Sequence, residues 1–182
     1  MDFYNVIENR TSVKDFTNTP VNKEKLSRMI NAAMRAPSWK NNTSYKMILV
    51  NNKNEKDRLS ETIMNDTDSA KNALKSAPMA MIVVADPSES GIMADREYYL
   101  VDSAVAMEHF VLAATNEGYG TCWIGALDED RVRDILNIPK EYRVVAMTPI
   151  GEIQQTPTHH HKKDVTEHVF LNNWGSSYTL ND

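Results

Sequence analysis

Apolar residues recur at helical spacing near the start of the chain. Phe3, Val6 and Ile7 would share one face of a short N-terminal helix. Pro20 and Asn22 precede a second run at the same spacing, which predicts a helix that begins there and ends before Pro37. The apolar face of this second helix would consist of Leu26, Met29, Ile30, Ala33 and Met34.

Three later segments also have helical patterns. Residues 53–76 are typical of a helical and mostly solvated stretch. Residues 96–117 are apolar over much more than one stripe, which predicts a long helix buried at the centre of the protein, with Gly118 as its cap. A short helix should begin near Asp128, because acidic residues occupy what would be its first turn.

Four apolar runs have the length of β-strands. Residues 47–50 and 79–85 are bounded by polar residues or proline and are typical of central strands covered on both faces. Residues 120–124 predict a third strand, and residues 142–150 predict a fourth that ends at Pro149. Strands and helices therefore alternate along the chain.

Length, charge and cysteine content narrow the class of protein. A chain of 182 residues without repeats or linkers predicts one domain, residues 1–182. The net charge of -5 argues against a protein held to nucleic acid by a broad basic field. A lone cysteine, Cys122, excludes an internal disulfide and a multi-cysteine metal site and fits a reducing compartment, so we expect the cytoplasm.

Neither end of the chain indicates a membrane protein. The N-terminus carries acids and has no long apolar core, so it does not resemble a secretory signal, and no segment approaches the roughly 20 apolar residues that span a bilayer. The tail after Gln154 lacks periodicity, but Phe170, Leu171 and Trp174 make it too apolar for simple disorder. We expect this tail to dock on another surface.

Residues 10–14 form the first candidate binding segment. Arg10 and Lys14 place two cations within five residues, and Ser12 adds a hydroxyl. Arginine offers a planar fork of donors suited to phosphate oxygens. In an extended segment Lys14 would point the same way as Ser12. Taken alone, the segment is better explained as solvated loop charges after a helix.

Two other segments have special backbone requirements. Pro37 would end a helix and lead Ser38 and Trp39 into an irregular segment, although a helix stop with a packed tryptophan has the same pattern. The glycines of residues 118–125 suit a sharp turn or a close approach to a flat ligand, and also an ordinary connection from helix to strand. Cys122 is better explained as a small buried filler than as a nucleophile, because no cation neighbours it in sequence.

The histidine run at residues 159–161 does not predict a metal site. Neighbouring side chains of an extended loop point to alternating sides and rarely share one ion. We expect these histidines to form a partly protonated patch, which suits a nearby anion better than a metal.

Four segments, taken together, resemble the FMN-dependent nitroreductase family. They occur in the family's order and at comparable spacing: residues 10–16, residues 36–41, residues 118–125, and a tail with Lys162 and Lys163 that ends in Trp174. The resemblance implies an α+β, three-layer α/β/α fold. In that fold a mixed sheet of four to five strands surrounds a long buried helix, and the tail docks on a partner subunit.

The resemblance also implies a set of cofactor-binding residues. Arg10 and Ser12 would hold the FMN phosphate, and Thr11 between them belongs to the same cofactor-binding set. Lys14 would lie beside N1 and O2 of the flavin ring, where a cation tunes its reduction. Backbone amides of Ile124 and Gly125, with Trp123 nearby, would face flavin N5. The remaining implied residues are Pro37, Ser38, Trp39 and Asn41, which would reach the flavin of the other subunit, and His160 and Lys162, which stand at the tail's phosphate-binding positions.

The sequence departs from the family pattern at three positions. Thr43 and Tyr45 stand where glutamine and tryptophan are usual, and Lys162 replaces an arginine, which removes a bidentate phosphate contact. The contacts to flavin and substrate are therefore expected to differ in detail from those of the family.

The implied function is an FMN-dependent oxidoreductase. NAD(P)H would reduce the flavin and leave, and a nitroaromatic, quinone or similar flat acceptor would then take the electrons in a ping-pong cycle. The enzyme would be a homodimer with two equivalent FMN sites at the subunit interface. The alternative is a non-catalytic FMN carrier or redox sensor on the same fold. The sequence leaves open the acceptor, the choice between NADH and NADPH, and the number of electrons passed per step.

Overall fold

The computed structural model describes residues 1–155, 157 and 164–179. A four-stranded sheet lies at its centre in the order β1 (Tyr45–Val50), β2 (Met79–Ala85), β6 (Arg143–Glu152) and β5 (Tyr119–Thr121). Neighbouring strands pair antiparallel, and Ser12 adds a parallel bridge to Thr121 at the β5 edge. The helices are α1 (Phe3–Asn9), α2 (Lys23–Ala33), α3 (Lys53–Ser60), α4 (Ser69–Ser76), α5 (Tyr98–Asn116) and α6 (Glu129–Leu136).

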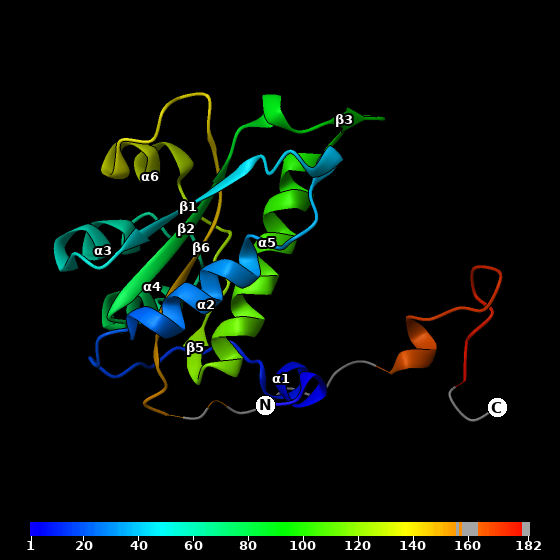
Figure 1. Ribbon diagram of the computed structural model, residues 1–182, viewed down its shortest axis with the longest axis horizontal. Coiled ribbons are helices and arrows are strands. Elements are labelled where there is room, and N and C mark those ends of the chain that lie inside the picture. The colour runs from blue at the N-terminus through cyan, green and yellow to red at the C-terminus, as the bar shows by residue number, and fades with distance from the viewer. Residues whose placement is uncertain (156, 158–163, 180–182) are drawn as a thin grey trace.

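The helices cover both faces of the sheet, which confirms the three-layer α/β/α fold (Figure 1). Side chains of successive strand residues point to opposite faces. Accordingly, Met81 and Val83 of β2 pack with α2 and α5, whereas Ala80 and Ile82 pack with α3, α4 and α6. β2 is thus covered on both faces, as its unbroken apolar run predicts.

Helix α5 is the predicted long buried helix. Its 19 residues include buried side chains on several sides, as expected for a helix without a single apolar stripe. Gly118 follows it with φ +83, a left-handed conformation that glycine adopts without strain, so the predicted cap is confirmed. The expected starts of α2 and α6 are confirmed as well, because the side chains of Asn22 and Asp128 cap these helices.

Two predicted elements differ from the structure. β1 is an edge strand paired only with β2, and Leu49 is exposed, so β1 is not a central strand covered on both faces. Short apolar runs do not distinguish edge from centre, because that depends on which strands pair. Residues 53–76 form two helices, α3 and α4, separated at residues 61–68.

Pro149 lies inside β6 and does not end it. Two residues before Pro149 in β6, Met147 exchanges two backbone hydrogen bonds of 2.9 Å with Ile124. Pro149 has no N–H to offer the chain at Cys122, so the ladder between β5 and β6 breaks there. The Thr148 hydroxyl fills the gap, since it accepts from the Cys122 N–H at 3.1 Å and donates to the Pro149 carbonyl at 2.9 Å. The predicted third strand therefore stops at Thr121 instead of Ile124.

The described part of the tail contains a short 3-10 helix, Val165–Glu167, and stands apart from the body of the protein (Figure 1). Phe170 packs against Trp174 with ring centroids 4.9 Å apart, yet Trp174 is 91% exposed. The tail thus presents an exposed tryptophan packed on a half-buried phenylalanine. Among the described helices, none has the length and apolar character needed to cross a membrane.

Candidate functional site

Residues 10–14 run beside residues 119–125, and we call the two segments together the β5-edge region. The Val13 N–H donates to the Thr121 carbonyl at 2.8 Å, next to the bridge between Ser12 and Thr121. Val13 also packs over Gly120, where an added Cβ would lie 2.7 Å from a Val13 methyl group. Backbone pairing and this close approach bring the first and third candidate segments together, although more than 100 residues separate them in sequence.

Lys14 and Cys122 meet inside the β5-edge region. The Lys14 ammonium donates to the Cys122 sulfur at 2.9 Å. Cys122 is buried, as expected for a small filler. No cation neighbours it in sequence, but the fold brings one from residue 14. Lys14 itself is exposed, so its charge is accessible to a ligand.

In the turn after β5, one of the two predicted backbone donors is occupied and the other has no acceptor among the described residues. The Ile124 N–H is occupied by the Met147 carbonyl at 2.9 Å. Gly125 is exposed, and its N–H has no acceptor among the described residues. Of the two amides predicted to face a flavin, Gly125 is therefore the free one. Trp123 is 41% exposed, with its indole nitrogen 3.7 Å from the position of a Cβ at Gly125.

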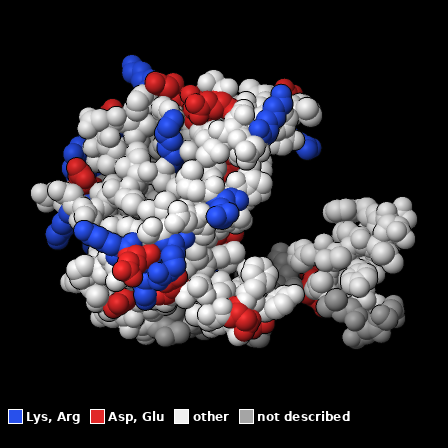
Figure 2. All heavy atoms as spheres, in the orientation of Figure 1, with Lys and Arg blue, Asp and Glu red and all other residues white. Residues whose placement is uncertain are grey.

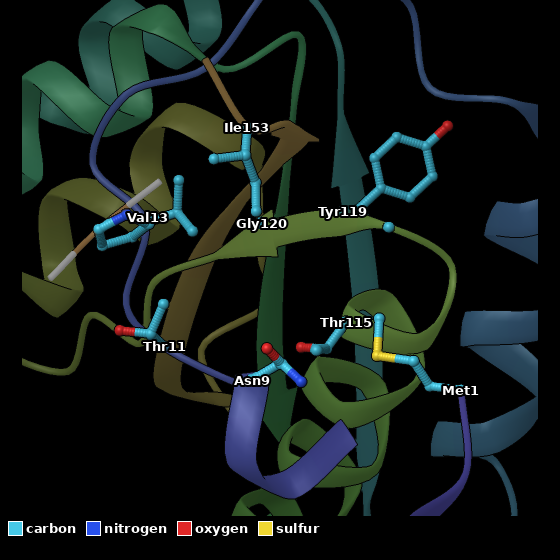
Figure 3. Close-up of a pocket in the computed structure, with 10 residues that line it drawn as sticks. Met1, Asn9, Thr11, Val13, Thr115, Tyr119, Gly120 and Ile153 are labelled. Carbon is cyan, nitrogen blue, oxygen red and sulfur yellow. The ribbon is translucent and has the colours of Figure 1, made fainter. Parts of the chain in front are cut away.

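A cavity of about 240 Å³ lies between α1, the end of α5 and β5 (Figure 3). Asn9, Thr11, Val13 and Thr115 line it, and its lining contains no Lys or Arg. Since side chains alternate along an extended segment, Thr11 and Val13 face this cavity and Ser12 and Lys14 face the other side. The cavity is thus separate from the predicted phosphate and flavin contacts, and Thr11 can offer only its backbone on the Lys14 side.

The charged residues elsewhere are interspersed. On the face shown in Figure 2, Lys and Arg alternate with Asp and Glu, and no large area of one sign appears. This face therefore has no broad basic surface, in agreement with the net charge of -5.

Residues 37–44, which we call the Trp39 loop, lie near the opposite end of α5. The Trp39 N–H donates to the Asp102 carboxylate at 2.7 Å, and the Trp39 ring centroid lies 4.4 Å from that of Tyr98. Asp102 is in the second turn of α5, whereas Thr115, beside the β5-edge region, is in the last. At a rise of about 1.5 Å per residue these positions are about 20 Å apart. A single chain therefore does not bring Pro37, Ser38, Trp39 and Asn41 to Arg10 and Lys14.

The Trp39 loop has a strained backbone. Lys40, Asn41 and Thr43 have φ values of 49, 60 and 55, the left-handed region that costs a non-glycine residue about 1–3 kcal/mol. The Ser38 hydroxyl accepts from the Thr43 N–H at 2.9 Å and closes the loop on itself. Such strain persists only where surrounding contacts hold it, and it is common at ligand-binding segments. The predicted end of the preceding helix is confirmed, since α2 stops at Ala33.

Thr43 in this loop and Tyr45 at the start of β1, the two departures from the family pattern here, have different surroundings. Tyr45 is buried and donates its hydroxyl to the Ala33 carbonyl at 2.8 Å, so it holds β1 to α2. Burial first, and then the negative charge of Asp102, raise the pKa of the Tyr45 phenol above its ordinary value. Thr43 is half-buried within the loop. Tyr45 thus has a structural role in this chain.

The sequence analysis missed Asp102. This residue is only 2% exposed and receives hydrogen bonds from three residues, two in the Trp39 loop and one at Ser90. A signal was present, since an acid within the apolar run of residues 99–107 must be buried, and a buried carboxylate requires donors. The sequence did not indicate which donors would meet it.

Two predicted site residues, His160 and Lys162, lie outside the described residues, as does the rest of the histidine run at residues 159–161. Within residues 1–155, 157 and 164–179, no three His, Cys, Asp or Glu side chains are grouped as metal ligands.

Comparison with known proteins identifies the family. The model of the nitroreductase family matches residues 7–152, which include the β5-edge region, the Trp39 loop and Asp102. The chain belongs to the nitroreductase family. A nitroreductase family protein from Clostridium novyi NT is 46% identical in a structural match with a TM-score of 0.84, which covers 98% of this chain and 97% of that one.

Two further relatives carry functional names. An FMN-dependent nitroreductase from Clostridium difficile R20291 is 25% identical with a TM-score of 0.83, over 94% of this chain and 100% of that one. A Methanothermobacter thermautotrophicus protein with the assigned name NADH dehydrogenase/NAD(P)H nitroreductase is 27% identical, over 86% of this chain and 80% of that protein. The family resemblance stated from the sequence is therefore confirmed, and these relatives support an oxidoreductase.

Proposed function

We propose that this protein is an FMN-dependent NAD(P)H oxidoreductase that reduces flat acceptors such as nitroaromatics or quinones in a ping-pong cycle. The observation that carries the proposal is the convergence in the β5-edge region. The pairing of residues 10–14 with β5 brings Lys14 to Cys122, three residues before Gly125, whose N–H has no acceptor among the described residues. Arg10 and Ser12 belong to the same paired segment. The lone cysteine fits action in the reducing cytoplasm.

These residues fit FMN by their chemistry. The guanidinium of Arg10 and the hydroxyl of Ser12 suit a phosphate, and Lys14 supplies a positive charge at the ring, where reduction adds negative charge. The N–H of Gly125 suits a hydrogen bond to a ring nitrogen. When bound, FMN supplies the hydride transfer, which no protein side chain performs. The role of the chain is to bind the ring, orient it and stabilise its reduced charge.

We propose further that each site combines two copies of the chain in a homodimer. About 20 Å of α5 separates the Trp39 loop from the β5-edge region in one chain, so Pro37, Ser38, Trp39 and Asn41 would serve the flavin of the other copy. Exposed apolar side chains at Phe3, Tyr4, Leu100 and Val101 and on the tail at Trp174 support a contact with a second copy. His160 and Lys162 would complete the phosphate site.

The cofactor assignment can be tested by comparing FMN with riboflavin, which lacks the phosphate. Arg10→Met should reduce the preference for FMN over riboflavin by about tenfold, the effect of one charge-assisted hydrogen bond. Lys14→Met should weaken both ligands equally and slow flavin reduction by NADPH about tenfold. Lys53→Met, which removes a cation of α3 that is paired with Asp57, is the matched control and should change neither quantity. Fluorescence titration and stopped-flow absorbance at the flavin band measure both.

Turnover distinguishes the enzyme from a flavin carrier or redox sensor. NADH or NADPH should bleach the bound flavin, and a nitroaromatic or quinone should restore its colour, with parallel lines in double-reciprocal plots. Bound flavin that NAD(P)H does not bleach would support the carrier. A protein that binds no FMN, or a stable monomer with full flavin content in sedimentation, would contradict the proposal.

A further inference from the structure

Asp102 joins three segments of the chain at one buried carboxylate. One oxygen, Oδ1, accepts from the backbone N–H of Trp39 at 2.7 Å. The other, Oδ2, accepts from the hydroxyls of Ser44 and Ser90, each at 2.9 Å. Trp39 and Ser44 lie at the two ends of the Trp39 loop, and Ser90 directly follows the short 3-10 helix Pro87–Glu89. Asp102 therefore fastens both ends of the Trp39 loop to α5.

The three hydrogen-bond donors to Asp102 are neutral groups. Asp102 forms no ion pair with any described residue, so its charge is stabilised inside the protein by hydrogen bonds alone. A buried carboxylate that loses its donors becomes strongly unfavourable, and donors that lose the carboxylate are left unsatisfied. The loop and α5 consequently hold one another in a single arrangement.

Other contacts of the Trp39 loop support the same arrangement. The Trp39 ring lies between Tyr98 and Gly91, and a Cβ at Gly91 would come within 2.2 Å of that ring. Asn42 donates its side-chain amide to the Glu89 carbonyl at 3.0 Å. The ring and Asn42 fix the middle of the loop, while Asp102 fixes its ends. A loop with three left-handed non-glycine residues depends on such fastening to keep its shape.

We propose that Asp102 is a positioning residue for flavin binding in the other subunit. It holds the Trp39 loop in the conformation that presents Ser38, Trp39 and Asn41 to the FMN of a second copy, and it touches no flavin itself because it is buried. This inference rests on the proposed function. It adds a residue of α5 to the determinants of a site about 20 Å from the cations of its own chain.

Alanine and asparagine substitutions test the role of the carboxylate. Asp102→Ala should weaken FMN binding about tenfold or more, because it removes all three hydrogen bonds. Asp102→Asn should stay within about threefold, since its amide oxygen can accept from Trp39 and its NH2 group can donate to the serine hydroxyls. The control is Ser103→Ala at the next position of α5, because the Ser103 hydroxyl is buried without a partner among the described residues. Equal affinity of Asp102→Ala and Ser103→Ala would overturn the proposal.

A milder variant tests the proposal even if Asp102→Ala does not fold. The double variant Ser44→Ala/Ser90→Ala removes both donors to Oδ2 and keeps the carboxylate and the Trp39 contact. It should weaken FMN binding about threefold to tenfold. Native affinity in this double variant would likewise overturn the proposal.

Mixed dimers show which subunit's flavin Asp102 serves. In a dimer of one Arg10→Met copy and one Asp102→Ala copy, one site has an intact β5-edge region and an intact Trp39 loop, so about one FMN should bind per dimer. The second mixed dimer pairs one Arg10→Met/Asp102→Ala copy with one native copy. Each of its sites then has either an altered β5-edge region or an altered Trp39 loop, and neither site should bind at the same FMN concentration. The opposite pattern would place the effect of Asp102 within its own chain and overturn the proposal. Failure of native protein to bind FMN would instead contradict the proposed function.

Discussion

The β5-edge region and the Trp39 loop lie at opposite ends of α5 and are built in different ways. Backbone hydrogen bonds hold the first, from Val13 to Thr121 and between Ile124 and Met147. Side chains hold the second, chiefly the carboxylate of Asp102 and the ring of Trp39. Backbone pairing depends little on which side chains are present, whereas a loop held by side chains depends on each of them. Substitutions should therefore perturb the Trp39 loop more strongly.

The largest effect on stability is expected at Gly91. In Gly91→Ala the new Cβ would lie 2.2, 2.5 and 2.6 Å from three atoms of the Trp39 indole, so the ring must leave its place beside Tyr98. We expect a loss of about 2–3 kcal/mol in the free energy of unfolding, the cost of overpacking, together with a changed near-UV circular dichroism signal. Gly125→Ala is the control, because its Cβ would have no neighbour nearer than 3.7 Å. Equal stability of the two variants would show that the loop is not held as described.

A smaller effect is expected at Gly120, the matching close approach in the β5-edge region. In Gly120→Ala the Cβ would lie 2.7–2.9 Å from side-chain atoms of Val13, which can shift with its segment while backbone pairing persists. We expect a loss of about 1–2 kcal/mol. Adding Val13→Ala should recover part of it, with a coupling energy of about 0.5–2 kcal/mol in a double-mutant cycle measured by urea unfolding. Strict additivity would mean that Val13 is not what limits the space at Gly120.

The smallest effect is expected at Cys122. Cys122→Ser keeps a small acceptor for the Lys14 ammonium in a region shaped by backbone pairing. We expect a loss of about 1 kcal/mol in stability, from burial of a more polar group, and FMN affinity within about twofold of native. A large loss of FMN affinity, measured by fluorescence titration, would show that the β5-edge region depends on this side chain as strongly as the Trp39 loop depends on Asp102.

Much of the fold could be predicted because its signals are local. The unbroken apolar run of residues 79–85 predicted β2, and the broad apolar surface of residues 96–117 predicted α5. Asn22, Asp128 and Gly118 marked helix ends through hydrogen bonds or φ values set within a few residues. The edge position of β1 and the interruption of β5 beside Pro149 were not predictable, because both follow from which strands pair.

The candidate site shows the same division between features set by local sequence and features set by long-range contacts. The sequence by itself determined the residue types that suit a flavin, namely Arg10, Ser12 and Lys14, and the order of segments that places the chain in its family. Three contacts were decided only by the tertiary structure. Lys14 donates to Cys122, the Ile124 N–H donates to the Met147 carbonyl, and Asp102 accepts from the Trp39 N–H and so holds the Trp39 loop. These contacts join residues between 23 and 108 positions apart. Periodicity and capping act over a few residues, whereas such contacts form only when packing of the sheet and α5 brings distant segments together.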